Sequence, residues 1–130
     1  MIQLDSHVAV WLSEGSERIS PRAKDAIRTA VASAEPLALS AVSLFEIATE
    51  IRKGRILLRV PVQAYFETMT TRLRIIPVSG EIARCAGELP RTFHNDPLDR
   101  MIVATAIVEN ATLITSDGPI RASGVCKTLW

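Results

Sequence analysis

Short segments that favour β-strands alternate along the chain with longer segments of helical periodicity, and this alternation most constrains the fold. The expected strands are residues 1–4, 37–39, 74–77, 112–115 and 125–129. Between them, apolar residues recur three and four positions apart, as in 23–34 and 101–108. Short apolar strands alternating with helices are typical of a parallel sheet covered on both faces. The sequence therefore predicts an α/β fold with a parallel sheet of about five short strands.

Polar residues and prolines predict where the helices begin and end. Ser20 and Asp96 each precede a proline, which places a capping side chain and a proline at a helix start. Ser43 is expected to open a further helix that Gly54 ends. Residues 116–119 (Ser-Asp-Gly-Pro) are expected to form a turn.

Composition indicates one globular domain, residues 1–130, of which 48% are apolar and 22% charged. The net charge of +1 excludes a uniformly basic surface of the histone-like kind. Cys85 and Cys126 have no metal-binding spacing, and we expect both to lie reduced in the core. No apolar run approaches the roughly 18 residues that span a bilayer, so we expect a cytoplasmic protein without membrane contact.

Five acidic residues stand where expected strands end or helices begin. They are Asp5, Glu46, Asp96, Asp99 and Asp117. Because ligands of doubly wound sheets bind at the carboxyl ends of the strands, these side chains are expected to converge there. Converging carboxylates stay ionised only beside a cation, and an all-oxygen set suits Mg²⁺ or Mn²⁺. Such an ion can activate a water molecule to attack a phosphodiester.

Each acid also has a purely structural explanation. Ser43 and Glu46 have the spacing of a capping box, and Asp96 stands where a helix N-cap is expected. Asp5 could cap the helix that begins at Ser6, and Asp117 is common in turns. No single acid is specific, and only their joint placement at one sheet edge indicates a site.

Other side chains are weaker candidates for binding. The basic residues Arg52, Lys53, Arg55 and Arg59 could follow an RNA backbone or contact an acidic partner, although such a run is usually a solvated face. His94 could contact a phosphate, although a lone histidine is more often structural. Trp11 and Trp130 are expected in the core or at a dimer contact, because few aromatic residues argue against an RNA reader based on stacking.

Four segments, in this order, resemble the PIN-domain ribonucleases, and most closely the VapC-type toxins of type II toxin–antitoxin pairs. They are Leu4-Asp5-Ser6-His7, residues 40–47 (SAVSLFEI), residues 94–106 (HNDPLDRMIVATA) and residues 113–117 (LITSD). The third, with its Asp-Pro-x-Asp-Arg start and Ala-rich continuation, is the most specific. The resemblance covers nearly the whole chain.

The resemblance implies a metal site of four acids, Asp5, Glu46, Asp99 and Asp117, with Asp96 as an auxiliary ligand. It also implies that Arg100 forms an ion pair near the site. Family members form homodimers and are inhibited by a cognate antitoxin, through which they reach DNA. The implied substrate is RNA, and the implied cofactor is Mg²⁺ or Mn²⁺.

The leading hypothesis is therefore a metal-dependent endoribonuclease, the toxin of such a pair. One alternative is a non-catalytic PIN-like binding module whose acids only cap helices. The other is a phospho-receiver domain, which needs a pair of acids after the first strand and a lysine after the last. This chain has only Asp5 at the first position, and Lys127 lies within the expected terminal strand.

Overall fold

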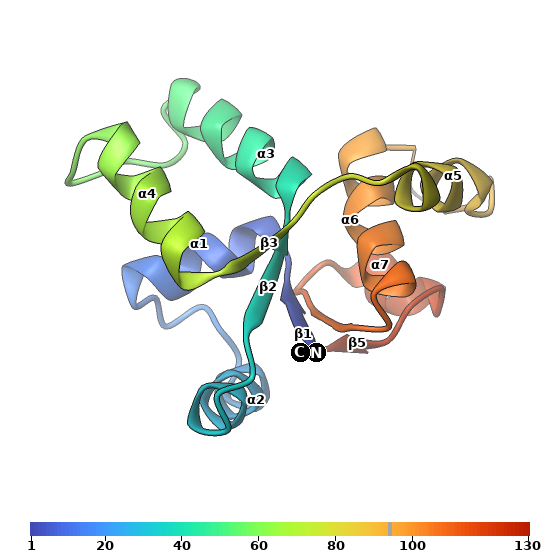
Figure 1. Cartoon of the computed structure of the whole chain (residues 1–130), viewed down its shortest axis with the longest axis horizontal. Helices are drawn as coiled ribbons and strands as arrows, with labels where there is room; N and C mark the ends of the chain where they lie inside the picture. Colours follow the sequence, from blue (N-terminus) through green and yellow to red (C-terminus); the bar gives the residue numbers. More distant parts are fainter. Residues whose placement is uncertain (94) are drawn as a thin grey trace.

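A computed structural model describes residues 1–93 and 95–130, and Figure 1 shows its strands and helices. In chain order these are β1 (Ile2–Leu4), α1 (Ser6–Glu14), α2 (Pro21–Ala32), β2 (Leu37–Ser40), α3 (Ala41–Arg52), α4 (Val62–Arg72), β3 (Arg74–Ile76), α5 (Gly80–Glu88), α6 (Pro97–Val108), β4 (Thr112–Ile114), α7 (Gly118–Ser123) and β5 (Thr128–Leu129).

The strands form one parallel sheet in the order β3-β2-β1-β4-β5. Leu4 of β1 pairs with Leu39 of β2 on one side and with Ile114 of β4 on the other. The chain builds outward from β1 to β3, then crosses back to β4. The carboxyl ends of β1 and β4 therefore flank the point where the winding reverses, which is where such sheets leave a crevice.

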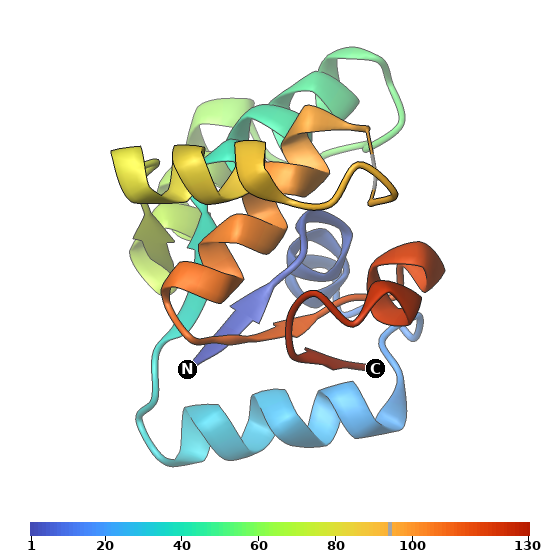
Figure 2. The ribbon, with the colours of Figure 1, turned by 90° about the vertical axis from the view of Figure 1, so that its right-hand side faces the viewer.

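Helices cover both faces of the sheet. Figure 1 shows α1, α2 and α4 on one side and α5, α6 and α7 on the other, and Figure 2 shows α2 and α5 on opposite sides of the strands. Helix α3 continues directly from β2 and packs against both α1 and α6. It thus lies at the end of the sheet where the two layers meet.

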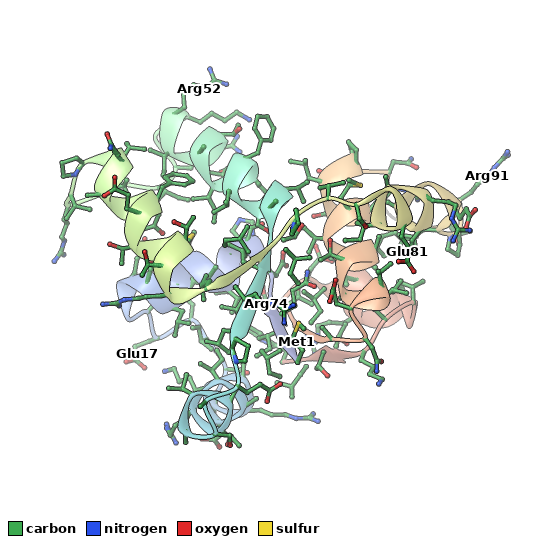
Figure 3. All side chains as sticks on the ribbon, in the orientation of Figure 1. Met1, Glu17, Arg52, Arg74, Glu81 and Arg91 are labelled. Atoms are coloured by element: carbon green, nitrogen blue, oxygen red, sulfur yellow. The ribbon has the colours of Figure 1, made fainter. Side chains whose placement is uncertain are left out.

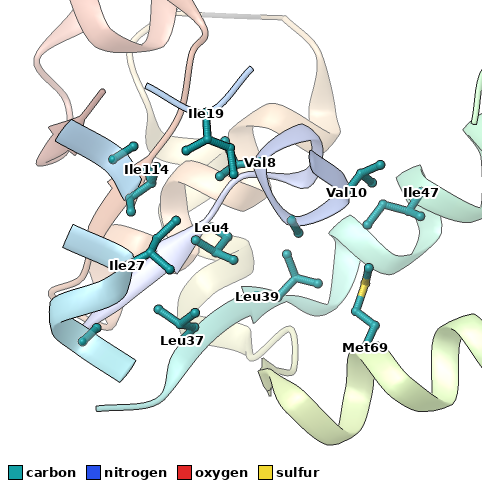
Figure 4. Packing of buried hydrophobic residues seen from close by; sticks show 13 residues of the cluster. Leu4, Val8, Val10, Ile19, Ile27, Leu37, Leu39, Ile47, Met69 and Ile114 are labelled. Atoms are coloured by element: carbon teal, nitrogen blue, oxygen red, sulfur yellow. The ribbon is translucent and has the colours of Figure 1, made fainter. Parts of the chain in front are cut away.

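The alternation of strand side chains divides the core between these layers. Leu4 and Leu39 point to the α1–α2–α4 face, where they pack with Val8, Ile27 and Met69 (Figure 4). On the opposite face, Leu113 packs against α6 and Ala38 against α5 and α6. The buried Gln3 also faces α6 and donates a 2.9 Å hydrogen bond to the carbonyl of Ile102. Both faces of the sheet are therefore buried.

The expected α/β fold with a five-stranded parallel sheet is confirmed, with local differences. The last strand, expected over 125–129, spans only Thr128–Leu129. Residues 116–119 were expected to form only a turn, but Asp117 caps the short helix α7. Helix α3 begins at Ala41 instead of Ser43, since β2 runs into it without a loop. Both cysteines are unbridged and half-buried, at the edges of the core. Among the described residues, no helix has the length and apolarity to cross a membrane.

Candidate active site

Five carboxylates line one cavity at the carboxyl ends of β1 and β4. The cavity has a volume of about 430 Å³, and we call it the acid cavity. The residues that line it are Asp5, His7, Trp11, Glu46, Asp96, Asp99, Ser116 and Asp117. The structure thus brings together all five acids that the sequence singled out, from α3, α6 and the segments that follow β1 and β4.

Asp5 is held at the end of β1 by three neighbours. Its backbone N–H continues the β1–β4 pairing to the carbonyl of Ile114, at 3.0 Å. Its Oδ1 accepts a 2.8 Å hydrogen bond from the N–H of Ser6, and this caps α1. Its Oδ2 accepts a 2.6 Å hydrogen bond from the hydroxyl of Thr115. This buried carboxylate therefore has a fixed orientation.

Asp117 is fixed in a similar way at the end of β4. Its N–H donates to Thr115 Oγ1 at 3.0 Å, and its Oδ1 accepts from the N–H of Ile120 at 2.8 Å, which caps α7. Thr115 therefore contacts both Asp5 and Asp117 and sets the spacing of these two acids.

Asp96 and Asp99 stand together at the start of α6. Asp96 Oδ1 accepts hydrogen bonds from the N–H groups of Leu98 and Asp99, at 2.8 and 3.3 Å, so the predicted N-cap is confirmed. Asp99 lies in the first turn of α6, near the positive end of the helix dipole, which favours negative charge. Capping and a position at the cavity are thus compatible in one residue.

Glu46 reaches the cavity from the second turn of α3 and does not form the predicted capping box. The N-cap of α3 is Ser40, and Ser43 lies inside the helix, where its buried hydroxyl has no hydrogen-bond partner among the residues that the structure describes. The capping-box interpretation was wrong because the N-cap of α3 lies three residues earlier, at Ser40 instead of Ser43. This removes the local explanation for an acid at position 46.

Burial and mutual repulsion raise the pKa values of two of the acids. The pKa of Asp5 rises above 3.8 mainly because burial disfavours the charged form, although the hydrogen bond from Thr115 opposes this. The pKa of Glu46 rises above 4.5, again mainly through burial and further through the charge of Asp5. An interaction with the side chain of Ser6 lowers this pKa and partly opposes the rise. A divalent cation would relieve this electrostatic strain, so the donor set fits such an ion. Within the described residues, no three acidic, histidine or cysteine side chains are already drawn together as a metal site.

The predicted basic residues do not line the acid cavity. Arg52 lies at the outer end of α3, away from the sheet (Figure 3), and Lys53, Arg55 and Arg59 follow it, all exposed. Arg55 forms a 3.2 Å ion pair with Glu50. His94 lies outside the described residues.

Arg100 makes contacts that the resemblance did not suggest. Its guanidinium donates to the backbone carbonyls of Ala86 and Leu89 at 3.0 and 2.7 Å, and to that of Pro90 at 3.3 Å. These carbonyls lie at the end of α5, where helix carbonyls lack internal partners. Arg100 therefore joins the end of α5 to the first turn of α6 through these hydrogen bonds.

Sequence reasoning missed three residues of the cavity wall, His7, Trp11 and Ser116. His7 and Trp11 lie one helical turn apart on α1, with ring centroids separated by 6.1 Å. This spacing places His7 and Trp11 on one side of α1, but the sequence does not tell which side of the helix faces the crevice.

A family model for the PIN domain matches residues 2–122. The chain belongs to the PIN-domain family. It is 37% identical over 121 residues to ribonuclease VapC22 of Mycobacterium tuberculosis, covering 93% of this chain and 90% of that protein. This confirms the resemblance to VapC-type PIN ribonucleases that the acidic segments indicated.

Solved structures of toxin–antitoxin complexes share the fold of this PIN domain. A VapBC2 complex from Rickettsia felis, bound to a promoter DNA fragment, matches with a TM-score of 0.74 and 23% identity, over 99% of this chain and 98% of that one. A DNA-bound VapBC from Salmonella typhimurium matches with a TM-score of 0.72 and 16% identity, over 98% and 96%. A toxin–antitoxin complex from Klebsiella pneumoniae matches with a TM-score of 0.69 and 21% identity, over 100% and 97%.

Proposed function

We propose that this VapC-type PIN ribonuclease hydrolyses RNA phosphodiesters with a Mg²⁺ or Mn²⁺ ion held by Asp5, Glu46, Asp99 and Asp117. The observation that carries the proposal is the convergence of these acids on one cavity at the winding-reversal point of the sheet. Asp96 is an auxiliary ligand, since its Oδ1 is already engaged in capping α6.

The protein's part in the reaction is to hold and orient these carboxylates. When bound, a divalent cation would supply a polarised water and neutralise charge that develops on the phosphoryl oxygens. Thr115 aims one oxygen of Asp5 and also fixes the backbone of Asp117. Asp99 stands in the first turn of α6, where the positive end of the helix dipole favours negative charge. Positioning and electrostatic stabilisation are the main sources of catalysis in phosphoryl transfer.

The substrate is expected to be single-stranded or looped RNA, because its unstacked bases are open to protein side chains, whereas the narrow major groove of an RNA duplex is closed to them. We propose that Arg52, Lys53, Arg55 and Arg59 contact the RNA backbone outside the cavity or an acidic partner. Their exposure supports this role. Contacts of His94 and Arg100 with RNA remain predictions from the sequence.

The partners proposed are a cognate antitoxin, a second copy of the chain and, through the antitoxin complex only, DNA. An apolar groove of about 550 Å³ between α1, α2 and α4 supports a protein partner, because the exposed Val31 and Val60 and the half-buried Leu73 line it. Co-purification with a small protein encoded directly upstream would test the antitoxin, and sedimentation would test the dimer.

Cleavage of RNA by purified protein tests the enzyme. We expect activity with Mg²⁺ or Mn²⁺, none in EDTA, and loss of at least a hundredfold in Asp5→Asn and Asp99→Asn. Glu67→Gln is the matched control, because Glu67 is an exposed acid on α4 that lines neither the acid cavity nor the cavity between α1 and α2, and it accepts a 3.0 Å hydrogen bond from Gln63. Undiminished cleavage in the first two variants would rule out the assignment and favour the non-catalytic module. Membership of the PIN family argues against the phospho-receiver alternative.

A further inference from the structure

Trp11 lies between the acid cavity and a second cavity. The second cavity, of about 270 Å³, lies between the end of α1, the loop that follows it, and α2. Trp11 lines both cavities and is only partly buried. Trp11 was expected to be a core or dimer residue, but part of its side chain is exposed to these two cavities.

The ring of Trp11 is held in place by its neighbours. Trp130 packs against it with a centroid distance of 6.0 Å and His7 with one of 6.1 Å. The guanidinium carbon of Arg18 lies 5.9 Å from the ring centroid. A ring fixed in advance loses little conformational entropy when a ligand contacts it.

The second cavity is chemically different from the acid cavity. Leu12, Ile19 and Ile27 give it an apolar lining, and the cationic residues Lys24 and Arg28 also line it. Both cations have exposed carboxylate partners, Glu17 and Asp25, and such surface pairs contribute little and exchange readily. A planar, uncharged group fits the apolar lining, and an adjoining phosphate fits the cations.

We propose that Trp11 positions the RNA by stacking against a nucleobase next to the cleaved phosphodiester, with the second cavity receiving that nucleotide. The proposal rests on the proposed ribonuclease function and names how its substrate is held. Carboxylates repel the RNA backbone, so binding energy must come from groups beside them. Trp11 is the aromatic residue shared by both cavities, and every base offers a face for stacking.

The test is a cycle between protein and RNA variants, measured as binding in EDTA, where no cleavage occurs. The probes are a short fluorescent single-stranded oligoribonucleotide and a series in which one position at a time is abasic. Trp11→Leu should weaken binding of the intact probe roughly five- to 150-fold, while Trp11→Phe should stay within about threefold of the parent. For the probe that is abasic at the stacked position, Trp11→Leu and the parent should bind with the same affinity.

Trp130→Leu is the matched control, because it also removes the ring contact between Trp11 and Trp130, and Trp130 lines neither cavity. It should lower the urea midpoint about as much as Trp11→Leu does but weaken binding far less, because the Trp11 ring that contacts the base is still present. Equal binding by Trp11→Leu and the parent, a penalty that persists at every abasic position, or no binding by the parent would each overturn the proposal. If the parent protein shows no metal-dependent cleavage but the binding results are as expected, only the ribonuclease function would be overturned.

Discussion

The hydroxyl of Thr115 donates a 2.6 Å hydrogen bond to Oδ2 of Asp5 and joins the end of β4 to the first carboxylate of the acid cavity. The same oxygen accepts the N–H of Asp117 at 3.0 Å. One buried hydroxyl thus links two proposed metal ligands on neighbouring strands. Its hydrogen bond also lowers the pKa of Asp5, against the effect of burial.

Thr115→Val should therefore shift the pH profile of cleavage. Without the hydrogen bond, the pKa of Asp5 rises further, and the acidic limb of kcat/KM moves to higher pH. The free energy of unfolding should fall by about 1–3 kcal/mol, as for a lost hydrogen bond to a charged group. Thr105→Val is the control, because Thr105 is equally buried and bonds to Met101 and Ser40. It should destabilise the protein without moving the profile, and a shift in both variants would contradict the role of Thr115.

Asp5 and Glu46 should make the metal-free protein more stable as pH falls through their raised pKa values. The folded-state pKa values of Asp5 and Glu46 lie above their ordinary values of 3.8 and 4.5, so the native state binds more protons than the unfolded state between those values and the raised ones. In that window the penalty for the buried charges is relieved as pH falls. Urea unfolding in EDTA at several pH values measures this.

Bound Mg²⁺ or Mn²⁺ should raise stability at neutral pH and flatten this dependence, because the cation stabilises the ionised carboxylates. Asp5→Asn should be at least as stable as the parent in EDTA, since Asn can still accept from the N–H of Ser6. It should gain less from metal than the parent. An Asn variant that is strongly destabilised in EDTA would show that the charge of Asp5 stabilises the fold.

Asp96 separates capping from metal binding, because asparagine caps helices as well as aspartate does. Asp96→Asn should leave the free energy of unfolding unchanged. It should moderately raise the metal concentration that cleavage needs, and its effect on cleavage should be smaller than that of Asp99→Asn. Asp96→Ala should in addition lose about 1 kcal/mol through the missing cap of α6. Metal titrations of the cleavage rate together with urea unfolding measure both effects. Full activity at low metal concentration in Asp96→Asn would leave Asp96 as a cap alone.

Much of the fold could be predicted from the sequence because its signals are local. Short strands alternate with helices, and Asp96–Pro97 marks the start of α6 without tertiary information. The acids could be placed at one edge because the direction of parallel strands fixes where each strand ends. Helix α7 was missed because its six residues include Gly118 and Pro119, which are also typical of turns.

The wall of the acid cavity could not be predicted for a different reason. Whether Trp11 faces the core or the crevice depends on how α1 is rotated over the sheet, and tertiary packing of Val8 and Val10 sets this. The contacts of Arg100 likewise depend on α5 lying across α6. The periodic pattern of the sequence does not predict such contacts between distant segments.

Ser43 offers the sharpest check on the revised start of α3. Since Ser43 is not an N-cap and its buried hydroxyl has no partner within residues 1–93 and 95–130, Ser43→Ala should leave the free energy of unfolding unchanged or raise it. Ser79→Ala is the comparison, because Ser79 caps α5 and accepts the N–H of Ile82 at 3.1 Å. That variant should lose about 1 kcal/mol. If urea unfolding instead showed that loss for Ser43→Ala, the hydroxyl would have a partner and the capping box would regain support.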